Sequence, residues 1–307
     1  MTTSKILVVG ASGSVGFPLA MALATDPSND VWGLARFSDP ASKRALEAAG
    51  ITCVTADLGT GDLGDLPDDF TYVLNFSTVK SMDNDWDTDL DTNVGGLGFV
   101  MHHCRSARAV LHCSSTNVYK ANGHHAFTER DPLGDTPRPS GVLATYTICK
   151  IASEAMARYC ARQYHLPTTI ARLNVPYGEH GGWPAAHAEM ILAGTPIPVH
   201  TNAPSLFNPI HHDDLAAMVP RLLEVASVPA TVVNWGGRDE VSVEDWCGHL
   251  GSLTGLSPTF EPSPDALESV VIDRTRMVEL AGDTVVDWRD GLRRMVEAKA
   301  PDLLNRP

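Results

Sequence analysis

Residues 5–16, with the sequence KILVVGASGSVG, decide the fold of this chain. The first part, Lys5 to Val9, is a short apolar run that ends at Gly10, which is typical of a buried β-strand. The alanine-rich segment from Val15 to Ala24 has helical periodicity, and Asp26-Pro27 ends it. The sequence therefore predicts a strand, a glycine turn and a helix in direct succession.

The glycine turn has the spacing Gly10-x-x-Gly13-x-x-Gly16 and lies between the predicted strand and helix. Glycines at such a turn let backbone amides approach a pyrophosphate, which the N-terminus of the following helix also attracts. A glycine triplet alone is often only a tight turn, but its position here favours a dinucleotide site. The expected contacts come from Gly10, Ser12, Gly13, Ser14, Val15 and Gly16.

Strands and helices continue to alternate along the chain. Further apolar runs predict strands at Val31–Ala35, Ile51–Thr55, Tyr72–Phe76, Ala109–Cys113 and Val232–Asn234. Helices are predicted at Ala41–Ala49, Asp89–Arg105, Thr145–Tyr164, Val243–Leu253 and Arg289–Ala298. Helix caps are expected at Ser242 and at Asp213-Asp214. This alternation predicts an α/β fold with a doubly wound parallel sheet of the Rossmann type, covered by helices on both faces.

The character of the sequence changes after Arg172, because Pro, Gly and His crowd residues 174–209. We therefore expect a nucleotide-binding Rossmann domain at residues 1–172 and a smaller lobe, mainly for substrate binding, at residues 173–307. Residues from about 210 to 235 are expected to return to the Rossmann core.

The composition excludes several classes of protein. The 307 residues are 43% hydrophobic and 20% charged, which is ordinary for a globular chain and not for a disordered or collagen-like one. With 23 Lys plus Arg against 37 Asp plus Glu, the net charge of -14 opposes binding to nucleic acid or anionic lipid. No segment has the roughly 20 apolar residues of a membrane span, and the N-terminus lacks a signal peptide, so we expect a cytoplasmic protein.

Cysteines and histidines do not suggest a metal site. The six cysteines are scattered without a CxxC pair and have mostly apolar neighbours, so we expect buried, reduced thiols. Adjacent histidines, such as His102-His103 and His211-His212, point apart in a strand and about 100° apart on a helix. We therefore expect no metal ion.

The end of the second predicted strand indicates which cofactor binds. In sheets of this type the residue that contacts the adenosine ribose lies at the carboxyl end of strand two, which here is Ala35 or Arg36. A guanidinium with no acid in place favours a 2′-phosphate, so NADP(H) is expected over NAD(H). The alternative is that Arg36 is only a solvated surface residue. Asp57-Leu58, just after the third strand, is expected to meet the adenine or to form an ordinary turn.

The hydroxyls of one tyrosine and of a Ser-Ser-Thr segment, together with one lysine ammonium, form a candidate acid–base site. Tyr146 and Lys150 are four residues apart on a predicted helix and so share one face. A cation beside a phenol stabilises the phenolate, which makes a tyrosine a usable proton donor and acceptor nearer neutral pH. Ser114-Ser115-Thr116 follows the fifth strand at the ligand-binding edge of the sheet, where a hydroxyl can bond a substrate oxygen.

With these motifs in this order, the chain resembles the extended short-chain dehydrogenase/reductase family, which includes nucleotide-sugar epimerases, dehydratases and many ketone reductases. The resemblance covers most of the chain and rests on Gly10–Gly16, Asp57-Leu58, Asn93–Gly95, Ser114–Tyr119, Thr128-Glu129 with Pro132, Tyr146–Lys150, Arg172–Gly178 and Ile210–Leu215. It implies that Ser115 holds the substrate oxygen, that Tyr146 is the acid or base, and that Lys150 binds the nicotinamide ribose and lowers the tyrosine pKa.

The same resemblance extends the site. Asn93 matches the family's helix asparagine and joins the catalytic group, and Lys80 falls where some epimerases carry an active-site lysine. Further cofactor contacts are expected from Phe76, Ser77, Lys80 and Asn174. The implied chemistry is hydride transfer between the nicotinamide and a carbinol carbon. The resemblance also implies a homodimer, formed through the helices near residues 89–105 and 145–164.

Departures from the family pattern narrow the substrate. Sugar dehydratases of the family carry an Asp-Glu pair where this chain has Thr116-Asn117, which do not titrate near neutral pH, so dehydration is disfavoured. Members that bind a nucleotide diphosphate usually carry arginines where this chain has Phe207 and the acidic segment Glu261–Asp265. A buried diphosphate without cations would be costly, so a substrate without a diphosphate fits better.

We therefore expect NADPH-dependent reduction of a ketone or aldehyde on a small molecule that lacks a diphosphate. A nucleotide-sugar 4-epimerase or ketoreductase stays open as an alternative, because a differently placed phosphate could meet Arg138, Arg172, His187 or Arg238. A cofactor-binding sensor without turnover is the other alternative, which the complete set of serine, tyrosine and lysine disfavours. Substrate contacts are expected from Thr116, Asn117, Trp183, His187 and Phe207, and the loop 122–141 is a candidate lid.

Overall fold

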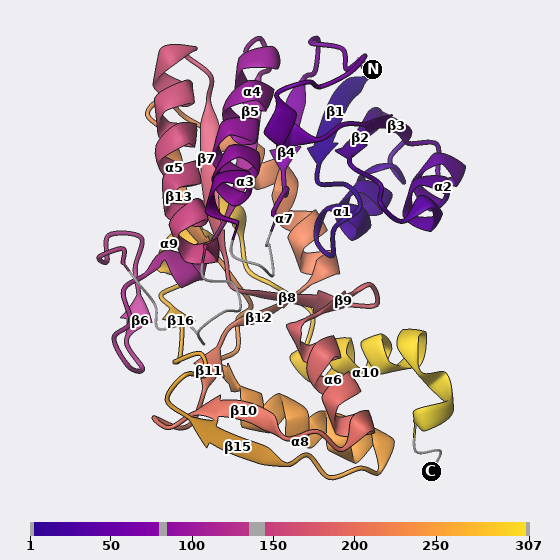
Figure 1. Cartoon of the computed structure of the whole chain (residues 1–307), viewed down its shortest axis with the longest axis vertical. Helices are drawn as coiled ribbons and strands as arrows, with labels where there is room; N and C mark the ends of the chain where they lie inside the picture. Colours follow the sequence, from indigo (N-terminus) through magenta and orange to yellow (C-terminus); the bar gives the residue numbers. More distant parts are fainter. Residues whose placement is uncertain (1–2, 80–84, 135–144, 305–307) are drawn as a thin grey trace.

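The larger part of the molecule is built on one parallel sheet (Figure 1). The structure is a computed structural model that describes residues 3–79, 85–134 and 145–304. Seven strands lie in the order β13-β7-β5-β4-β1-β2-β3, and all neighbouring pairs are parallel. They are β1 Ser4–Val9, β2 Asn29–Ala35, β3 Thr52–Thr55, β4 Tyr72–Asn75, β5 Ala109–Ser115, β7 Thr168–Leu173 and β13 Thr231–Trp235. The predicted doubly wound α/β fold is confirmed.

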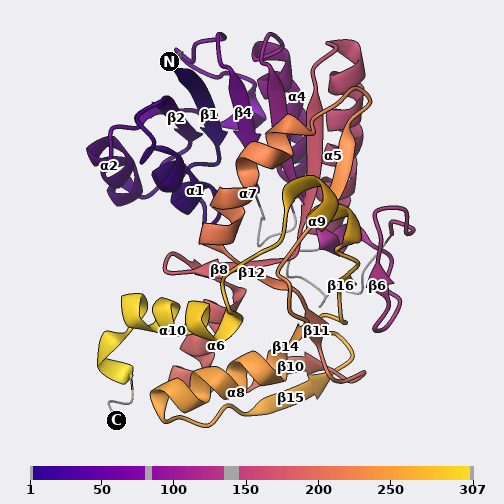
Figure 2. The ribbon, with the colours of Figure 1, turned by 180° about the vertical axis from the view of Figure 1, so that it is seen from behind.

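Helices cover both faces of this sheet (Figures 1 and 2). One face carries α1 Gly16–Leu23, α2 Pro40–Ala48, α7 His212–Glu224 and α9 Thr275–Ala281, and the other carries α3 Trp86–Leu90, α4 Gly96–His103 and α5 Tyr146–Gln163. Successive side chains of a strand point to opposite faces. Ile6 and Val8 of β1 therefore join the core beneath α1 and α7, whereas Leu7 and Val9 join the core beneath α4 and α5.

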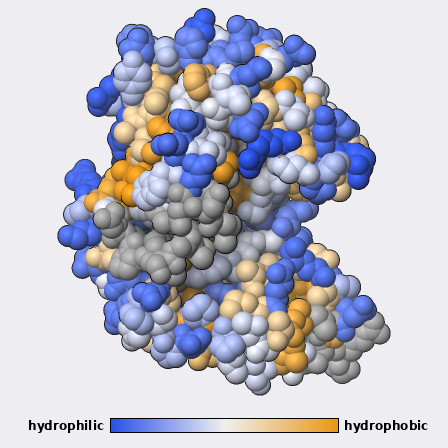
Figure 3. All heavy atoms as spheres, in the orientation of Figure 1, coloured by the Kyte–Doolittle hydropathy of each residue, from blue (hydrophilic) through white to orange (hydrophobic). Residues whose placement is uncertain are grey.

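A smaller lobe with its own core lies beyond the carboxyl ends of the sheet strands. Its helices, α6 Trp183–Ala193, α8 Val243–Thr254 and α10 Trp288–Lys299, pack together around buried rings such as Trp246 and Trp288. The remaining short strands are β6 Ala126–Phe127, β8 Val175–Gly178, β9 Gly181–Gly182, β10 Ile197–His200, β11 Leu206–Phe207, β12 Pro209–His211, β14 Val241–Ser242, β15 Phe260–Ser263 and β16 Val271–Ile272. Figure 3 shows a notch between the two parts on one side of the molecule.

The boundary between the two parts at residues 172 and 173 stays a prediction. Two later segments pack with the sheet: β13 pairs with β7, and α7 covers the strands. The segment α9 also packs against β13 and α7, although it follows the stretch from 210 to 235 that was expected to return to the core.

One local prediction holds with a difference in detail, and one was wrong. The helix expected at residues 89–105 is divided into α3, a π-helical turn Asp91–Gly95 and α4. Within it, Asn93 Nδ2 donates to the Asp89 carbonyl, which a regular α-helix would bond to the Asn93 amide. The cap of α7 is His211, whose Nδ1 accepts from the Asp213 amide. Asp214 instead accepts from the amides of Val285 and Val286, so it ties a distant loop to this helix.

Other expectations concern caps, thiols, membranes and metals. Ser242 caps α8 as predicted, because its hydroxyl accepts from the Asp245 amide at 2.9 Å. All six cysteines are unpaired, and only Cys53 among them is not buried.

None of the helices within the described ranges combines the length and hydropathy needed to cross a bilayer. Among the described residues, no group of three or more His, Cys, Asp or Glu side chains is arranged to hold a metal ion.

Candidate active site

A cavity of about 900 Å³ lies at the carboxyl edge of the sheet, between the two parts of the molecule. It is lined by most of the predicted site residues: Gly10, Ser12, Gly13, Ser14, Val15, Arg36, Asp57, Leu58, Phe76, Ser77, Ser115, Thr116, Asn117, Tyr146, Lys150, Asn174, Trp183 and Phe207. Gly16, Asn93 and His187 do not line it. Lys80 lies outside the described residues, as does Arg138.

The glycine turn packs its backbone tightly against the segment that follows strand β4. Gly10 has φ +79°, and a Cβ atom there would lie 2.7 Å from the Ser77 amide nitrogen. A Cβ on Gly16 would lie 2.3 Å from the Gly10 carbonyl oxygen, so Gly16 acts through packing of helix α1 and not through the cavity wall. Helix α1 has no side-chain cap. Its Phe17 amide already donates to the Gly13 carbonyl at 2.9 Å and Pro18 has no amide hydrogen, so a ligand would meet mainly the backbone of the turn before the helix. The turn fits the pyrophosphate of a dinucleotide.

The far end of the cavity is formed by the loops after β2 and β3. Arg36 follows β2 directly, is exposed, and lines the cavity beside Ser38 and Ser42. Asp57 caps a short 3₁₀ turn, Leu58–Thr60, by accepting from the Gly59 amide at 3.1 Å. The Ser42 hydroxyl donates to the Asp39 carbonyl at 2.7 Å. The Arg36 guanidinium and the Ser38 hydroxyl are therefore the donors that could bind a phosphate group on the ribose.

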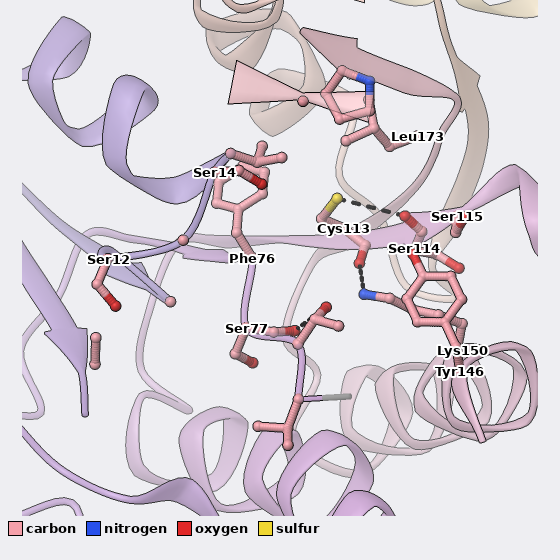
Figure 4. A pocket seen from close by; sticks show the side chains of 18 of the residues that line it. Ser12, Ser14, Phe76, Ser77, Cys113, Ser114, Ser115, Tyr146, Lys150 and Leu173 are labelled. Carbon is pink, nitrogen blue, oxygen red and sulfur yellow. Dashed lines mark hydrogen bonds between the residues drawn. The ribbon is translucent and has the colours of Figure 1, made fainter. Parts of the chain in front are cut away.

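The predicted acid–base residues lie together at the other end (Figure 4). Lys150 is buried, and its Nζ donates to the Cys113 carbonyl at 2.9 Å. The same Nζ lies 5.9 Å from the centre of the Tyr146 ring. Ser115 Oγ accepts from the Asn117 amide at 3.2 Å, and this bond leaves the hydroxyl hydrogen to donate to a ligand. Figure 4 shows these three side chains across the cavity from Ser12.

A buried ion pair lies directly behind this group. Glu154 is two turns after Tyr146 on α5, and its carboxylate accepts two bonds of 2.8 Å from Nε and Nη2 of Arg172 on β7. Ser114, next to Ser115 on β5, donates to the same carboxylate at 2.7 Å. Burial alone would lower the pKa of Arg172, but the hydrogen bonds and charge of Glu154 outweigh it and raise that pKa. The pair therefore joins α5 to β5 and β7.

A second buried network connects the cavity wall with the helix of Lys150. Ser77 Oγ donates to Asn75 Oδ1 at 2.7 Å, and Asn75 Nδ2 donates to His112 Nδ1 at 3.1 Å. His112 Nε2 is 3.0 Å from Ser153 Oγ, which donates to the Lys150 carbonyl at 2.9 Å. Burial and the nearby charge of Lys150 lower the pKa of His112 to about 3. The imidazole is therefore neutral with its proton on Nε2, since Nδ1 accepts.

Asn93 does not line the cavity but holds a segment of its wall. Its Oδ1 accepts from the Val79 amide at 2.9 Å, and its Nδ2 donates to the Val79 carbonyl at 3.0 Å. Val79 itself lines the cavity. The structure therefore gives Asn93 a positioning contact in place of the expected contact with the reacting atoms.

The part of the cavity in the smaller lobe has a different chemical character. Trp183, Phe207 and Leu267 line it beside Val175 and Pro176. The polar side chain of Asn174 makes hydrogen bonds within the protein. Its Nδ2 donates to Thr116 Oγ1 and to the Val270 carbonyl, and its Oδ1 accepts from the Asn208 amide.

His187 was expected to contact substrate, and the structure assigns it elsewhere. Its ring is buried behind Trp183, and its Nδ1 accepts from Trp246 Nε1 at 2.9 Å. Burial lowers the pKa of His187 to about 4. The side chain is a neutral part of the lobe's core because the aromatic rings around it exclude water.

Sequence reasoning missed three residues that support the site: Glu154, Asn75 and His112. Glu154 had a usable signal, since it is four residues after Lys150 and lies on the same face of the helix. Asn75 and His112 belong to neighbouring strands β4 and β5, where they pair in register. Nothing in their sequence spacing indicates this contact.

Comparison with known proteins gives consistent results. The model of the NAD dependent epimerase/dehydratase family matches residues 6–236. A curated relative, described as an uncharacterized UDP-glucose epimerase of Bacillus subtilis, is 22% identical over 273 residues, covering 83% of this chain and 84% of that protein.

Solved structures with the same fold include two enzymes bound to NAD. The UDP-glucuronic acid 4-epimerase of Bacillus cereus, in complex with UDP-glucuronic acid and NAD, has a TM-score of 0.82 and 20% identity, over 96% of this chain and 98% of that one. The dTDP-glucose 4,6-dehydratase DesIV of Streptomyces venezuelae has a TM-score of 0.81 and 20% identity, over 97% of each chain. With the family model matched over most of its length, this chain belongs to the NAD-dependent epimerase/dehydratase family and is an NAD(P)-dependent enzyme of the short-chain dehydrogenase/reductase type.

Proposed function

We propose that the protein catalyses NADP(H)-dependent interconversion of a ketone or aldehyde and its alcohol, on a small molecule that lacks a diphosphate. One observation carries the proposal: among the described residues, the wall of the cavity in the smaller lobe has no cationic side chain. This part of the wall is lined by the apolar side chains of Trp183, Phe207 and Leu267. A diphosphate bound against them would lose its hydration without gaining a counter-charge.

The described candidate cations that could have met a differently placed phosphate are engaged away from the cavity. Arg172 is buried in its pair with Glu154. Arg238 lies 3.5 Å from Asp239 and does not line the cavity. His187 is a neutral core residue, as described above. These contacts support a substrate without a diphosphate.

The preference for NADP(H) rests on Arg36. Its guanidinium is the cation at the ribose end of the cavity among the described lining residues, where Ser38 adds a hydroxyl donor. A 2′-phosphate would accept charge-assisted hydrogen bonds from this group, and an unphosphorylated ribose would not use its charge.

In the proposed mechanism the chain's own residues bind the substrate oxygen and move its proton. A bound nicotinamide would supply or accept the hydride at the substrate carbon. Ser115 Oγ donates a hydrogen bond to the substrate oxygen, and Tyr146 Oη gives that oxygen a proton in reduction or takes it in oxidation. Lys150, fixed by its bond to the Cys113 carbonyl, stabilises the phenolate with its charge. Ser115, Tyr146 and Lys150 are thus the proposed catalytic residues.

A nucleotide-sugar 4-epimerase is the second candidate. It is supported by the likeness of nearly the whole chain to the UDP-glucuronic acid 4-epimerase of Bacillus cereus. An epimerase returns the hydride to the same substrate, so it would keep its cofactor bound through turnover. This behaviour separates the two candidates.

We also propose a homodimer formed through α4 and α5. These helices pack beside each other on one face of the sheet. They carry apolar side chains that lie open in the single chain: Phe99 is 46% exposed and Tyr159 is 60% exposed. A second copy would remove these rings from water.

The test combines cofactor and substrate specificity. Purified protein is first analysed for retained cofactor, then titrated calorimetrically with NADP⁺, NADPH, NAD⁺ and NADH. It is next assayed for NADPH oxidation with a panel of ketones and aldehydes, and with UDP-glucose and UDP-glucuronic acid. We expect a freely exchanging NADP(H), and turnover of carbonyl compounds that uses it. Tightly retained NAD together with conversion of a UDP-sugar would overturn the proposal in favour of the epimerase.

A further inference from the structure

Trp183 occupies a distinctive position in the cavity wall. It is the first residue of α6, directly after Gly182, and its side chain is half-buried. Gly182 has φ +122°, and a Cβ there would lie 2.3 Å from the Pro176 carbonyl oxygen. This close contact between β8 and β9 fixes the backbone from which Trp183 extends to the cavity.

Three aromatic rings hold the indole of Trp183. Phe207 meets it edge to face, with ring centres 5.0 Å apart and planes at 87°. Trp246 meets it at 5.5 Å and 72°, and His187 at 5.0 Å and 51°.

The rings behind Trp183 are themselves fixed. Trp246 is stacked on His187 at 5.7 Å and 23°, and its Nε1 donates to His187 Nδ1. The Trp183 indole is thus oriented in advance, and a ligand that packs on it costs little side-chain entropy.

The charged residues among the described cavity-lining residues belong to the larger part of the molecule, whereas the indole belongs to the smaller lobe. Among the described lining residues the cations are Arg36 and Lys150, and the acids are Asp39 and Asp57. Arg36, Asp39 and Asp57 belong to the loops after β2 and β3, at the ribose end, and Lys150 belongs to the catalytic group. A substrate group resting on Trp183 would therefore be desolvated without a charged partner, which disfavours an ionised group there and favours an apolar one.

We propose that the substrate is an uncharged carbonyl compound, or its alcohol, with an aromatic or alicyclic ring next to the reacting carbon, and that this ring stacks on Trp183. The inference rests on the proposed function and names its substrate class. The ring would pack on Trp183, in the part of the cavity that Leu267 also lines, and the carbonyl oxygen would bond to Ser115 and Tyr146. In reduction, a bound NADPH would supply a hydride to the carbonyl carbon as the C=O π bond breaks, and the oxygen would take the Tyr146 proton, which solvent returns to the phenolate. The products would be the alcohol and NADP⁺.

The test compares two ketones across variants of Trp183. Acetophenone carries a ring beside the carbonyl, and butan-2-one does not. For the native protein we expect kcat/KM for acetophenone to exceed that for butan-2-one at least tenfold. Trp183→Phe keeps this ratio within about threefold, whereas Trp183→Ala lowers it at least tenfold through KM. Trp86→Ala removes a 42% exposed tryptophan on α3 and serves as the matched control, with an unchanged ratio.

A binding measurement keeps the inference testable without turnover. Titration of the NADP⁺ complex with acetophenone should quench tryptophan fluorescence, and Trp183→Phe should remove most of the quenching. Trp183→Leu replaces Trp183→Ala if the alanine variant does not fold.

The outcomes separate the inference from the function. If ketones are reduced but the ratio is the same in native protein and Trp183→Ala, the stacking role fails while the proposed function stands. If no ketone is reduced or bound and a UDP-sugar is converted, the proposed function fails and the inference with it. Competition by uridine that depends on Trp183 would also overturn the inference, because the ring on the indole would then be a nucleobase.

Discussion

The two ends of the cavity are supported in different ways. Behind Ser115, Tyr146 and Lys150 lie buried polar networks, in which each bond has a defined direction. Behind Trp183 lie aromatic rings, with a single hydrogen bond between Trp246 and His187. Proton transfer needs atoms held within hydrogen-bond distance, whereas recognition of an apolar group needs a shape. Polar support therefore suits the catalytic end, and apolar support suits the end that selects a substrate.

The largest expected effect comes from the proton-transferring phenol. Tyr146→Phe removes one oxygen and leaves the ring, so turnover should fall by about 10²–10⁴-fold while NADP(H) binding is retained. Steady-state rates and calorimetric titration measure the two quantities. Tyr159→Phe, on the exposed side of the same helix, is the control and should keep full activity. Near-normal turnover of Tyr146→Phe would show that the proton moves through another group.

The polar support behind the catalytic end gives the next largest effect. Glu154→Gln keeps the shape of the side chain but leaves the buried Arg172 guanidinium without a counter-charge. Breaking a buried pair from one side lowers the free energy of unfolding by about 3–5 kcal/mol. Urea denaturation measures the loss.

A matched control exists on α2, where Glu47 lies 3.9 Å from Lys43 in an ion pair open to solvent. Glu47→Gln should change stability by about 0.5 kcal/mol or less. If Glu154→Gln were as mild as Glu47→Gln, the buried pair would not be what joins α5 to β5 and β7.

How much of the candidate site could be predicted from the sequence depends on how far apart the contacting residues lie along the chain. The glycine turn, and the Tyr146 and Lys150 pair, are set by spacing within one turn or one helix, so their position on the cavity was predictable. In the hydrogen-bond network of Ser77, Asn75, His112 and Ser153, directly bonded residues are up to 41 positions apart in the sequence. The register that brings Asn75 beside His112 exists only in the folded sheet. Local patterns do not contain that information.

The smaller lobe shows the same limit. Trp183 and His187 are four residues apart on α6, and both were expected to contact substrate. Only Trp183 reaches the cavity, because Trp246 of a distant helix packs over His187 and takes its Nδ1 as an acceptor. The direction in which an aromatic side chain points is decided by such tertiary packing, and helical spacing alone gives both residues the same face.

The ribose end gives a smaller but selective effect. Arg36→Ala removes the cation proposed to bind the 2′-phosphate, and a hydrogen bond to a charged group is worth about 1.5–3 kcal/mol. Affinity for NADP(H) should therefore fall by about 10–150-fold, while affinity for NAD(H) changes by less than about threefold. Calorimetric titration of both cofactors measures this. Arg44→Ala, a nearby exposed arginine on α2 that does not line the cavity, should change neither. Equal losses for both cofactors would remove the phosphate role of Arg36.

Per unit of pH, the buried histidine at the catalytic end gives the smallest expected effect. Burial and Lys150 lower the pKa of His112 from 6.5 to about 3. Below pH 6.5 the unfolded chain therefore binds a proton at this residue, whereas the folded chain does not. The free energy of unfolding consequently falls as the pH drops toward 3. One such proton contributes at most about 1.4 kcal/mol per pH unit. His112→Gln cannot take up this proton, so its free energy of unfolding, measured in urea from pH 6.5 to 4, should fall less steeply than that of the native protein. Parallel slopes would mean that His112 is protonated within the fold, and the directed chain from Ser77 to Lys150 would then be wrong, because a charged imidazole cannot accept the Asn75 hydrogen bond.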